Sequence, residues 1–278
     1  MLDGNRTWSM EANRIGDSSV FDYFRIEVFD GLDQRIKDFL AVTALLPTVS
    51  AGIASQLTEL EKAGELLAYL NRNNYFTERY QDEYRYHPLF RDFLLSEAKR
   101  SLAPEKRREV QCRAGKLLLD SGRTEEGINL LIAAQDWDSV VPAALAAASG
   151  LVAEGRSQTL EGWIGSLPDE IRSGSPWLLY WLGVCRQPYD PDESRLLFDR
   201  CFTLCNQTGD TACTLLAWSG AVMSICIGQG QFRLLGPLID WLDAFTARGG
   251  SFPSREGHRG NGSLQHGGGP HGIPALSP

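Results

Sequence analysis

Residues 75–94 read YFTERYQDEYRYHPLFRDFL, and this stretch decides the predicted fold. Two aromatic-rich runs, Tyr75–Tyr80 and Tyr84–Tyr86, flank a short polar segment, a pattern typical of a β-hairpin. Pro88 follows at a position that suits the first turn of a helix, and apolar residues then recur at helical spacing. The stretch therefore predicts a β-hairpin that leads directly into a helix.

Three helices are predicted upstream of the hairpin. The first opens at Asp33 and closes at Leu45–Pro47, because the residue before a proline is pushed out of the helical region. Ser50 suits the N-cap of a short second helix, and a third is expected over Ala63–Asn73. With the hairpin and its following helix, they predict a winged-helix-like unit over residues 20–103.

From Pro104 onward the sequence carries only helix signals. Short helices with short connections favour antiparallel α-hairpins stacked as a degenerate, TPR-like solenoid over residues 104–248. Helix starts are expected after Ser175, Asp190 and Asp210. The predicted fold class is mainly α: a winged-helix-like unit with one β-hairpin, followed by helical repeats.

The two ends of the chain differ from this pattern. Residues 1–19 show no periodicity and are expected to be irregular. Residues 249–278 hold nine of the 28 glycines and three of the four histidines, with few apolar residues. Such a segment cannot bury enough surface to order itself. We expect a disordered tail, and we attribute its composition to a change of reading frame in the gene.

The overall composition excludes several classes of protein. The chain has 278 residues, of which 43% are hydrophobic and 22% charged, as in an ordinary globular protein. Its net charge of −8 argues against direct nucleic-acid binding, which needs clustered lysine and arginine. No apolar run reaches the ~20 residues of a membrane span, and no secretory signal opens the chain. The predicted location is cytoplasmic, without membrane contact.

The six cysteines lie inside apolar helical patterns without CxxC spacing. Cys201 and Cys205 are four residues apart and could share one face of a helix. They could form a metal or redox pair, or serve as small core residues, which is the commoner role of free cysteine. The core interpretation is preferred, and no metal site is predicted.

The segment Tyr84–Leu94 resembles the post-ATPase region of the large ATP-dependent LuxR-family transcriptional regulators, the MalT-like members of the STAND class. The resemblance runs from Ser19 to Phe245 and rests on the order and spacing of short motifs. The further motifs are Val20–Phe24, Phe39–Leu45, Asn74–Phe76, Arg113–Lys116, Gly127–Ile128 and Gln135–Trp137.

The resemblance implies the interdomain switch and helical sensor region of a signal-responsive regulator. In that family a P-loop ATPase precedes this region and a DNA-binding helix-turn-helix follows it. Neither motif occurs here, so a fragment is expected, with ATP or ADP bound only by the missing ATPase module. The expected partners are that module and a protein or small-molecule inducer on the repeats. The alternative is a free-standing helical-repeat scaffold that binds other proteins.

No catalytic residues are predicted, and the chain is not expected to be an enzyme. His87 is the one histidine before the tail, and no nucleophile motif lies near it. In related STAND proteins a histidine at a similar position contacts the phosphate of bound ADP, which makes His87 a nucleotide-sensor candidate. The family motif has aspartate where this chain has Pro88, so a purely structural role for His87 stays open.

Two further sets of residues have open interpretations. The run Glu105–Arg108 could dock the ATPase module or form a solvated helix face. Four tryptophans could line a groove of the repeats that contacts an inducer, or could pack between hairpins. These are Trp163, Trp177, Trp181 and Trp218.

Overall fold

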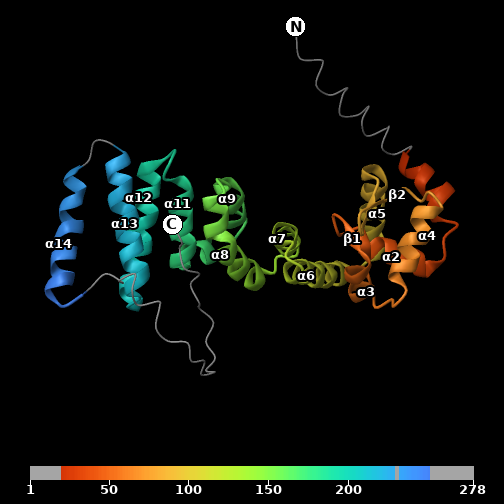
Figure 1. The fold of residues 1–278 in the computed structure, drawn as a ribbon, viewed down its shortest axis with the longest axis horizontal. Coiled ribbons are helices and arrows are strands. Elements are labelled where there is room, and N and C mark those ends of the chain that lie inside the picture. Colours follow the sequence, from red (N-terminus) through yellow and green to blue (C-terminus); the bar gives the residue numbers. More distant parts are fainter. Residues whose placement is uncertain (1–19, 229–231, 251–278) are drawn as a thin grey trace, which may run out of the picture. The chain divides into compact units, whose positions relative to one another are not determined.

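The computed structural model describes residues 20–228 and 232–250, and Figure 1 shows its helices and strands. Two compact units divide the chain, residues 1–139 and residues 140–278. Within the described residues, no helix combines the length and the apolar character that a membrane crossing needs.

The first unit holds the small sheet and most of the shorter helices. Its elements are η1 (Phe24–Phe29), α2 (Gln34–Thr43), β1 (Val49–Ser50), α3 (Ala51–Thr58), α4 (Ala63–Arg72), β2 (Thr77–Tyr80), β3 (Glu83–Tyr86), α5 (Pro88–Ser101), α6 (Pro104–Asp120) and α7 (Thr124–Ala133). The following helix, α8 (Trp137–Ala153), crosses the boundary between the two units.

The predicted hairpin is confirmed, and the sheet has one more strand than the sequence indicated. The strand order is β1-β3-β2, and both pairings are antiparallel. In the hairpin Thr77 lies opposite Tyr86, and Tyr80 lies opposite Glu83. The short strand β1 pairs Val49 with Tyr84 on the other side of β3. Glu83 and Tyr84 therefore lie on the central strand, with neighbours on both sides.

Local sequence explains where the helices of this unit begin. The Asp33 carboxylate accepts a hydrogen bond from the Arg35 amide at 2.8 Å, and the Ser50 hydroxyl accepts one from Ile53 at 3.2 Å. These side chains satisfy amides that a helix start leaves without partners. Pro88 is the first residue of α5, where its missing N–H costs nothing.

An aromatic cluster between η1, β3 and α5 forms the centre of the winged-helix core. Phe24 meets Phe76 at a centroid distance of 4.9 Å and Phe90 at 5.3 Å, both edge to face. Tyr86 is fully buried, and its hydroxyl shares a 2.7 Å hydrogen bond with Thr43 of α2. Burial raises the pKa of Tyr86 strongly, so this phenol stays neutral. The hydrogen bond satisfies both hydroxyls and ties β3 to α2.

Helices α6 and α7 pack together at a pair of glycines. A β-carbon placed on Gly127 would lie 2.8 Å from the Gly115 carbonyl oxygen, and one on Gly115 would lie 2.7 Å from the Leu131 side chain. Neither position has space for a larger residue, because one neighbour is backbone and the other belongs to the facing helix. The glycines therefore permit an approach of the two backbones that other residues would prevent.

The second unit is entirely helical in its described residues. Its further elements are α9 (Ser157–Gly165), α10 (Asp169–Gly174), α11 (Pro176–Arg186), α12 (Pro191–Thr208), α13 (Thr211–Ile227), η2 (Phe232–Leu234) and α14 (Leu235–Ala247). The predicted caps are present: the side chains of Ser175, Asp190 and Asp210 accept hydrogen bonds from Leu178, Glu193 and Cys213.

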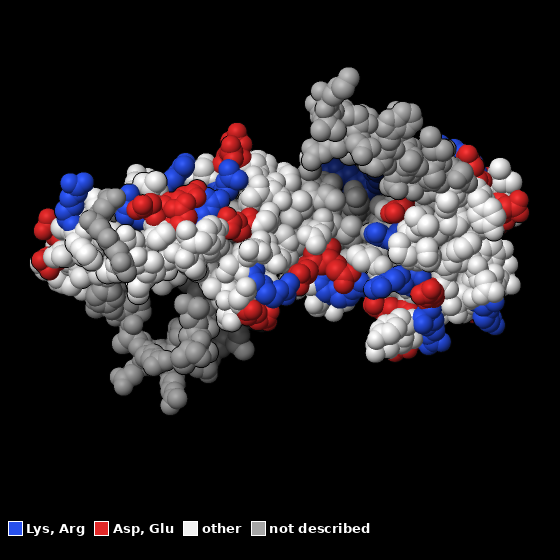
Figure 2. All heavy atoms as spheres, turned by 90° about the horizontal axis from the view of Figure 1, so that it is seen from above, with Lys and Arg blue, Asp and Glu red and all other residues white. Residues whose placement is uncertain are grey.

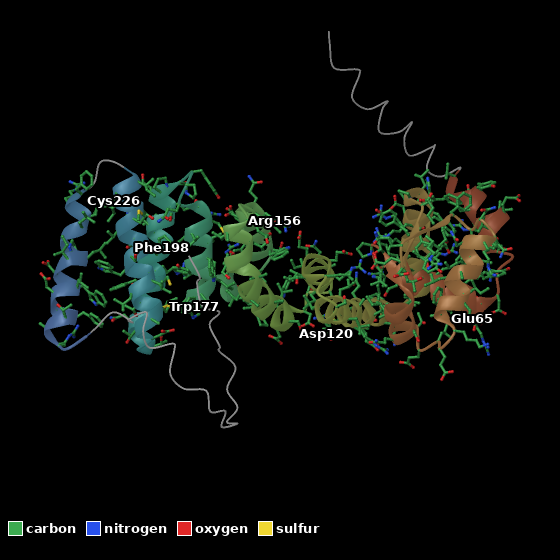
Figure 3. All side chains as sticks on the ribbon, in the orientation of Figure 1. Glu65, Asp120, Arg156, Trp177, Phe198 and Cys226 are labelled. Atoms are coloured by element: carbon green, nitrogen blue, oxygen red, sulfur yellow. A yellow bond between two sulfur atoms is a disulfide. The ribbon has the colours of Figure 1, made fainter. Side chains whose placement is uncertain are left out.

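Phe198 of α12 is the central residue of the α11–α13 packing, and Figure 3 labels it there. Its side chain is fully buried, and one ring edge lies between Gly183 of α11 and Gly220 of α13. Beside it, the Ser194 hydroxyl donates to the Gly183 carbonyl at 2.8 Å and lies 3.0 Å from the Ser224 hydroxyl. Two bare glycines and a buried hydrogen-bond network thus hold three helices together.

The mainly α fold class is confirmed, together with the single hairpin of the winged-helix unit. The predicted seam at residues 103/104 falls inside the first compact unit, since α6 packs against α3 and α5, and α7 packs against α6. The domain boundaries stay a prediction, as does the TPR-like character of the repeats. The predictions for residues 1–19 and for the tail from 251 onward lie outside the described residues.

Candidate functional site

His87 lies between the hairpin and α5, as the sequence indicated. Its amide donates to the Phe76 carbonyl at 2.7 Å, and its carbonyl accepts from the Arg91 amide at 2.8 Å. The side chain is exposed and makes no capping hydrogen bond to the helix. Only the backbone of His87 therefore has a structural role here, and the imidazole is accessible to another molecule or module.

The helix behind His87 is fixed to the rest of the winged helix by charged side chains. Arg91 donates to the Leu46 carbonyl at 3.2 Å, just beyond the end of α2. Glu97 is only 3% exposed, and its carboxylate bonds Arg25 of η1 at 3.0 Å and also Arg100. Because a buried carboxylate is costly without cations, Arg25 and Arg100 together stabilise this position. Helix α5 is thus held at both ends.

Arg123 joins the winged helix to the α6–α7 helix pair, within the same compact unit. It lies just before α7, and its guanidinium donates to Glu83 of β3 at 3.1 Å and to the Thr48 hydroxyl at 2.6 Å. It also pairs with Glu126 in the first turn of α7. Thr48 in turn donates to Glu83 at 2.6 Å. The side chain of Arg123 is only 17% exposed, so water screens these contacts weakly.

A second arginine connects the same two parts from α6. Arg113 pairs with Glu59 at 3.0 Å and donates to the carbonyl of Gln56, both near the end of α3. These residues line an open cleft of about 470 Å³, whose wall also includes Leu117 and Glu61. Together, Arg113 and Arg123 attach α6 and α7 to α3 and to the sheet.

The charged run at the start of α6 is mostly exposed. Lys106 pairs with Glu109 of its own helix at 3.0 Å, and Arg108 makes one long hydrogen bond of 3.4 Å to the Gln135 carbonyl. This geometry fits the solvated-face interpretation, while docking of an ATPase module stays a prediction. On the face shown in Figure 2, the described basic and acidic side chains are intermixed rather than gathered into a basic field.

The four tryptophans singled out in the sequence have different environments. Trp163 of α9 is buried, at 4% exposed, so it is part of the core. Trp177 and Trp181 on α11 are partly buried and each meets Tyr180 edge to face, at 5.9 and 5.2 Å. Trp218 on α13 is partly buried too, and its indole N–H donates to the Leu238 carbonyl of α14 at 2.9 Å. The structure places Trp177 and Trp181 together, and a role in inducer contact stays a prediction for all four.

The cysteines on α12 differ in part from expectation. Cys201 is a fully buried free thiol, as the core interpretation holds. Cys205 is buried too, but it forms a disulfide with Cys213 of α13, so it is not a free core cysteine. Burial raises the pKa of Cys201 to about 12, with a further contribution from the charge of Asp210.

Sequence reasoning missed Arg123, Thr48 and Glu83 as a connected group. Each is an ordinary polar residue in a loop or strand, and only the pairing of β1 with β3 brings Thr48 beside Glu83. It also missed Cys213 as the partner of Cys205. The single signal for that pair was the short connection through Gly209 and Asp210, which returns α13 alongside α12.

Comparison with known proteins identifies the first part of the chain. Residues 26–106 match the family model described as the MalT winged helix domain. Two curated relatives, from two strains of Klebsiella pneumoniae, are each named HTH-type transcriptional regulator MalT and are 29% identical over 157 residues. The match covers 55% of this chain but only 17% of each relative. Residues 26–106 are therefore similar to the MalT winged helix domain, and the chain as a whole matches only a small part of the length of these two regulators.

Proposed function

We propose that this chain is the interdomain switch and helical sensor region of a signal-responsive, MalT-like transcriptional regulator of the LuxR family and STAND class. The names of both relatives describe a transcriptional regulator, and the winged helix domain is of the MalT type. In this proposal the chain is not an enzyme. ATP or ADP is bound by an ATPase module that these residues do not supply, and the protein works in the cytoplasm.

One observation carries the proposal: strand β3 connects the Arg123 contact directly to His87. Glu83, which receives Arg123, is the first residue of β3, and His87 follows its last residue. Four extended residues span about 13 Å. Movement of α6 and α7 that disturbs Arg123 would therefore reach His87 through a single strand. The strand is held on both sides by β1 and β2 and resists bending.

His87 is the proposed contact with the nucleotide state of the ATPase module. Its exposed imidazole at the start of a 14-residue helix is accessible to a phosphate held by another module. The related motif has an aspartate where this chain has Pro88, so His87 alone would contact the phosphate. This chain without an ATPase module is expected to bind no ADP, and calorimetric titration with ADP measures that directly.

The helical repeats are the proposed receptor for a protein or small-molecule inducer. The partly buried rings of Trp177 and Trp181 offer aromatic surface next to Tyr180. An inducer can shift the switch only if it binds one of the two states more tightly than the other. A difference of ~5.5 kcal/mol in binding free energy moves a two-state equilibrium from 1:99 to 99:1. No direct contact with nucleic acid or membrane is proposed for these residues.

A chimeric regulator tests the proposal. Residues 20–139 would replace the matching segment of a Klebsiella MalT, with transcription from a MalT-dependent reporter as the readout. We expect an inducible chimera, and we expect Arg123→Ala to alter the inducer response at unchanged protein level. Arg108→Ala, which removes only a long contact at an exposed site, is the matched control. A chimera that is inducible to the same degree with and without Arg123 would contradict the proposed connection from Arg123 through β3 to His87.

The alternative is a free-standing helical-repeat scaffold, and genomic context separates the two. A P-loop reading frame upstream and a helix-turn-helix frame downstream support the regulator. Intact unrelated neighbours, together with partner binding that ignores ATP and ADP, would favour the scaffold.

A further inference from the structure

Three buried cysteines meet where α12 turns into α13. Cys201 and Cys205 lie one helical turn apart on α12, and Cys213 lies in the first turn of α13. The Cys201 sulfur is 3.9 Å from that of Cys205 and 3.8 Å from that of Cys213, while Cys205 and Cys213 form a disulfide. All three side chains are at most 1% exposed.

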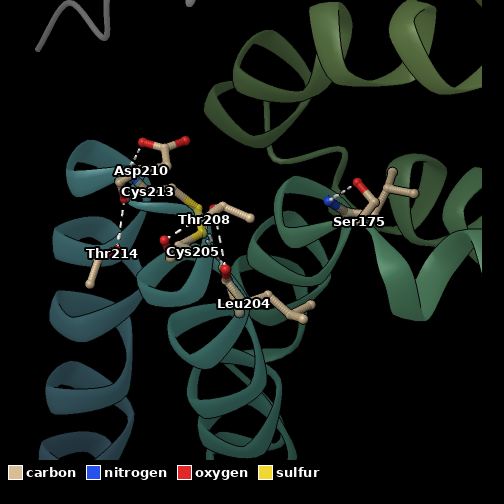
Figure 4. Close-up of a disulfide and its surroundings, with 9 residues drawn as sticks. Ser175, Leu204, Cys205, Thr208, Asp210, Cys213 and Thr214 are labelled. Carbon is tan, nitrogen blue, oxygen red and sulfur yellow. Dashed lines mark hydrogen bonds between the residues drawn. A yellow bond between two sulfur atoms is a disulfide. The ribbon is translucent and has the colours of Figure 1, made fainter.

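Figure 4 shows the disulfide between Cys205 and Cys213 and the Asp210 cap beside it, at the turn between α12 and α13. Gly209 ends α12 in the left-handed conformation, with φ of 73°, which favours glycine. Asp210 then caps α13 by accepting a hydrogen bond from the Cys213 amide at 3.0 Å. The backbone that carries Cys213 is therefore positioned independently of the disulfide, and reduction would leave the three sulfurs close together.

The cluster is enclosed by apolar side chains. Leu179 and Ala217 are buried beside it, and Trp177, Tyr180, Leu197 and Phe202 pack around it. Three cysteine sulfurs and no fourth metal-binding residue form the cluster in the part of the chain that the structure describes. Such a shell excludes water, so a fourth ligand from solvent has no direct path to the sulfurs.

Two of the three sulfur–sulfur distances, 3.9 and 3.8 Å from Cys201, already suit trigonal metal–thiolate geometry, and reduction of the Cys205–Cys213 bond would let the third pair separate to a similar distance. Three atoms at the corners of a triangle with edges near 3.9 Å lie ~2.3 Å from its centre, which is the usual length of a metal–thiolate bond. Soft thiolates select Cu(I) and Zn²⁺, and Zn²⁺ is almost always four-coordinate in closed structural sites. Three ligands in an apolar shell favour Cu(I).

We propose that Cys201, Cys205 and Cys213 of the reduced chain form a three-thiolate Cu(I) site, and that the Cys205–Cys213 disulfide is the oxidised, metal-free form of the same site. Binding forms three Cu–S bonds and releases three thiol protons, and copper stays Cu(I). Opening the disulfide takes two electrons and two protons, which a phosphine and water supply by conversion to the phosphine oxide. The site would therefore load only under reducing conditions.

The test uses the full chain, reduced with a phosphine and kept free of oxygen. Cu(I) alone is titrated in competition with a chromogenic Cu(I) chelator, and the thiolate-to-copper charge-transfer band is recorded. We expect one tightly held Cu(I) per chain, with three sulfur ligands in the X-ray absorption spectrum. The disulfide form, prepared with a mild oxidant and freed of that oxidant, should not bind Cu(I) tightly.

Variants separate this site from the other cysteines. Cys201→Ser and Cys201→Ala should weaken Cu(I) binding by more than the ~10–100-fold typical of losing an outer-shell partner. Cys185→Ala is the matched control, because Cys185 is also a buried free thiol on a neighbouring helix. Cys226→Ser controls for an exposed thiol. Circular dichroism verifies the fold of each variant, and alkylation mapping of wild type provides a readout that needs no variant.

Bound Cu(I) should protect the three cluster cysteines from maleimide during unfolding, while Cys112 and Cys226 react. The proposal is overturned by weak or non-stoichiometric Cu(I) binding to the reduced chain, by equal binding after loss of Cys201, or by equal protection of all cysteines. Tight Zn²⁺ binding without Cu(I) binding would also overturn the three-coordinate assignment. These outcomes are independent of any role in transcription.

Discussion

Replacing Gly220 by alanine should unfold the second unit more readily, because the added methyl group has no space. The new β-carbon would lie 2.6 Å from Cε1 and Cζ of the Phe198 ring, against a favourable carbon–carbon separation of ~3.5–4.0 Å. The ring cannot move away, because a β-carbon on Gly183 would already lie 3.0 Å from the same two atoms. Confinement between α11 and α13 therefore concentrates the strain at Phe198.

The net effect follows from two opposing contributions. Overpacking of a well-filled core costs ~1–3 kcal/mol, and confinement of the ring on both sides places this case near the upper end. Alanine in a helix interior gains ~1 kcal/mol over glycine. The free energy of unfolding should fall by about 2 kcal/mol. Gly162→Ala is the control: no atom lies within 4 Å of its β-carbon position, so this helix substitution should stabilise by up to ~1 kcal/mol.

Urea unfolding followed by tryptophan fluorescence measures the change in the free energy of unfolding, mainly that of the second unit. That unit holds Trp163, Trp177, Trp181, Trp218 and Trp241. The double substitution Gly220→Ala with Phe198→Leu should lose less than the sum of the two single losses, because the smaller side chain leaves room for the methyl group. Equal stability of Gly220→Ala and wild type, or strict additivity in the double variant, would refute the confinement of the ring.

Three further predictions concern the first unit. Gly127→Ala should lower its stability by about 2 kcal/mol in thermal unfolding, because the clash of the methyl group with the Gly115 carbonyl oxygen at 2.8 Å outweighs the gain of alanine over glycine in a helix. An unchanged Tm would contradict the close approach. Arg123→Ala should cost about 1–3 kcal/mol and raise hydrogen exchange in β3, while Arg108→Ala should do neither. Burial raises the pKa of Asp136, but hydrogen bonds from Lys116 and Ser139 outweigh it and hold that pKa below its ordinary value. The Asp136 carboxylate therefore contributes stability above its unfolded pKa of ~3.9 and loses that contribution as pH falls through the folded value. Asp136→Asn should flatten the acid side of the stability profile, and an NMR titration midpoint at or above the ordinary value would contradict this.

The sequence predicted the elements that depend on local signals. Ser50, Ser175, Asp190 and Asp210 cap helices as expected, because a side-chain oxygen at that position satisfies nearby amides whatever the tertiary fold. The hairpin was also predictable from the sequence, since aromatic residues flank a polar turn. The place of His87 between the hairpin and α5 follows from the same local pattern, whereas the exposure of its side chain does not.

The features that sequence reasoning missed depend on contacts between distant residues. Strand β1 has two residues, too few to show any periodicity, and forms only because Val49 finds Tyr84 on β3. The π-helix η1 departs from the α-helical spacing that apolar patterning detects. The third cysteine of the buried cluster and the partners of Arg123 were likewise invisible, because spacing along the chain does not reveal which helices and strands will meet.

The glycine contact between α6 and α7 has a mechanical consequence. Rotation of either helix against the other would bring Gly127 into contact with the Gly115 carbonyl, so the two helices move as one rigid body. Bending can then occur at Leu102 and Ala103, which connect α5 to α6 in extended conformations. Arg113 and Arg123 oppose this motion, because rotation of the helix pair about Leu102 and Ala103 would separate both arginines from their partners on the winged helix. A displacement of the helix pair from the winged helix would therefore break the ion pairs of Arg113 with Glu59 and of Arg123 with Glu83.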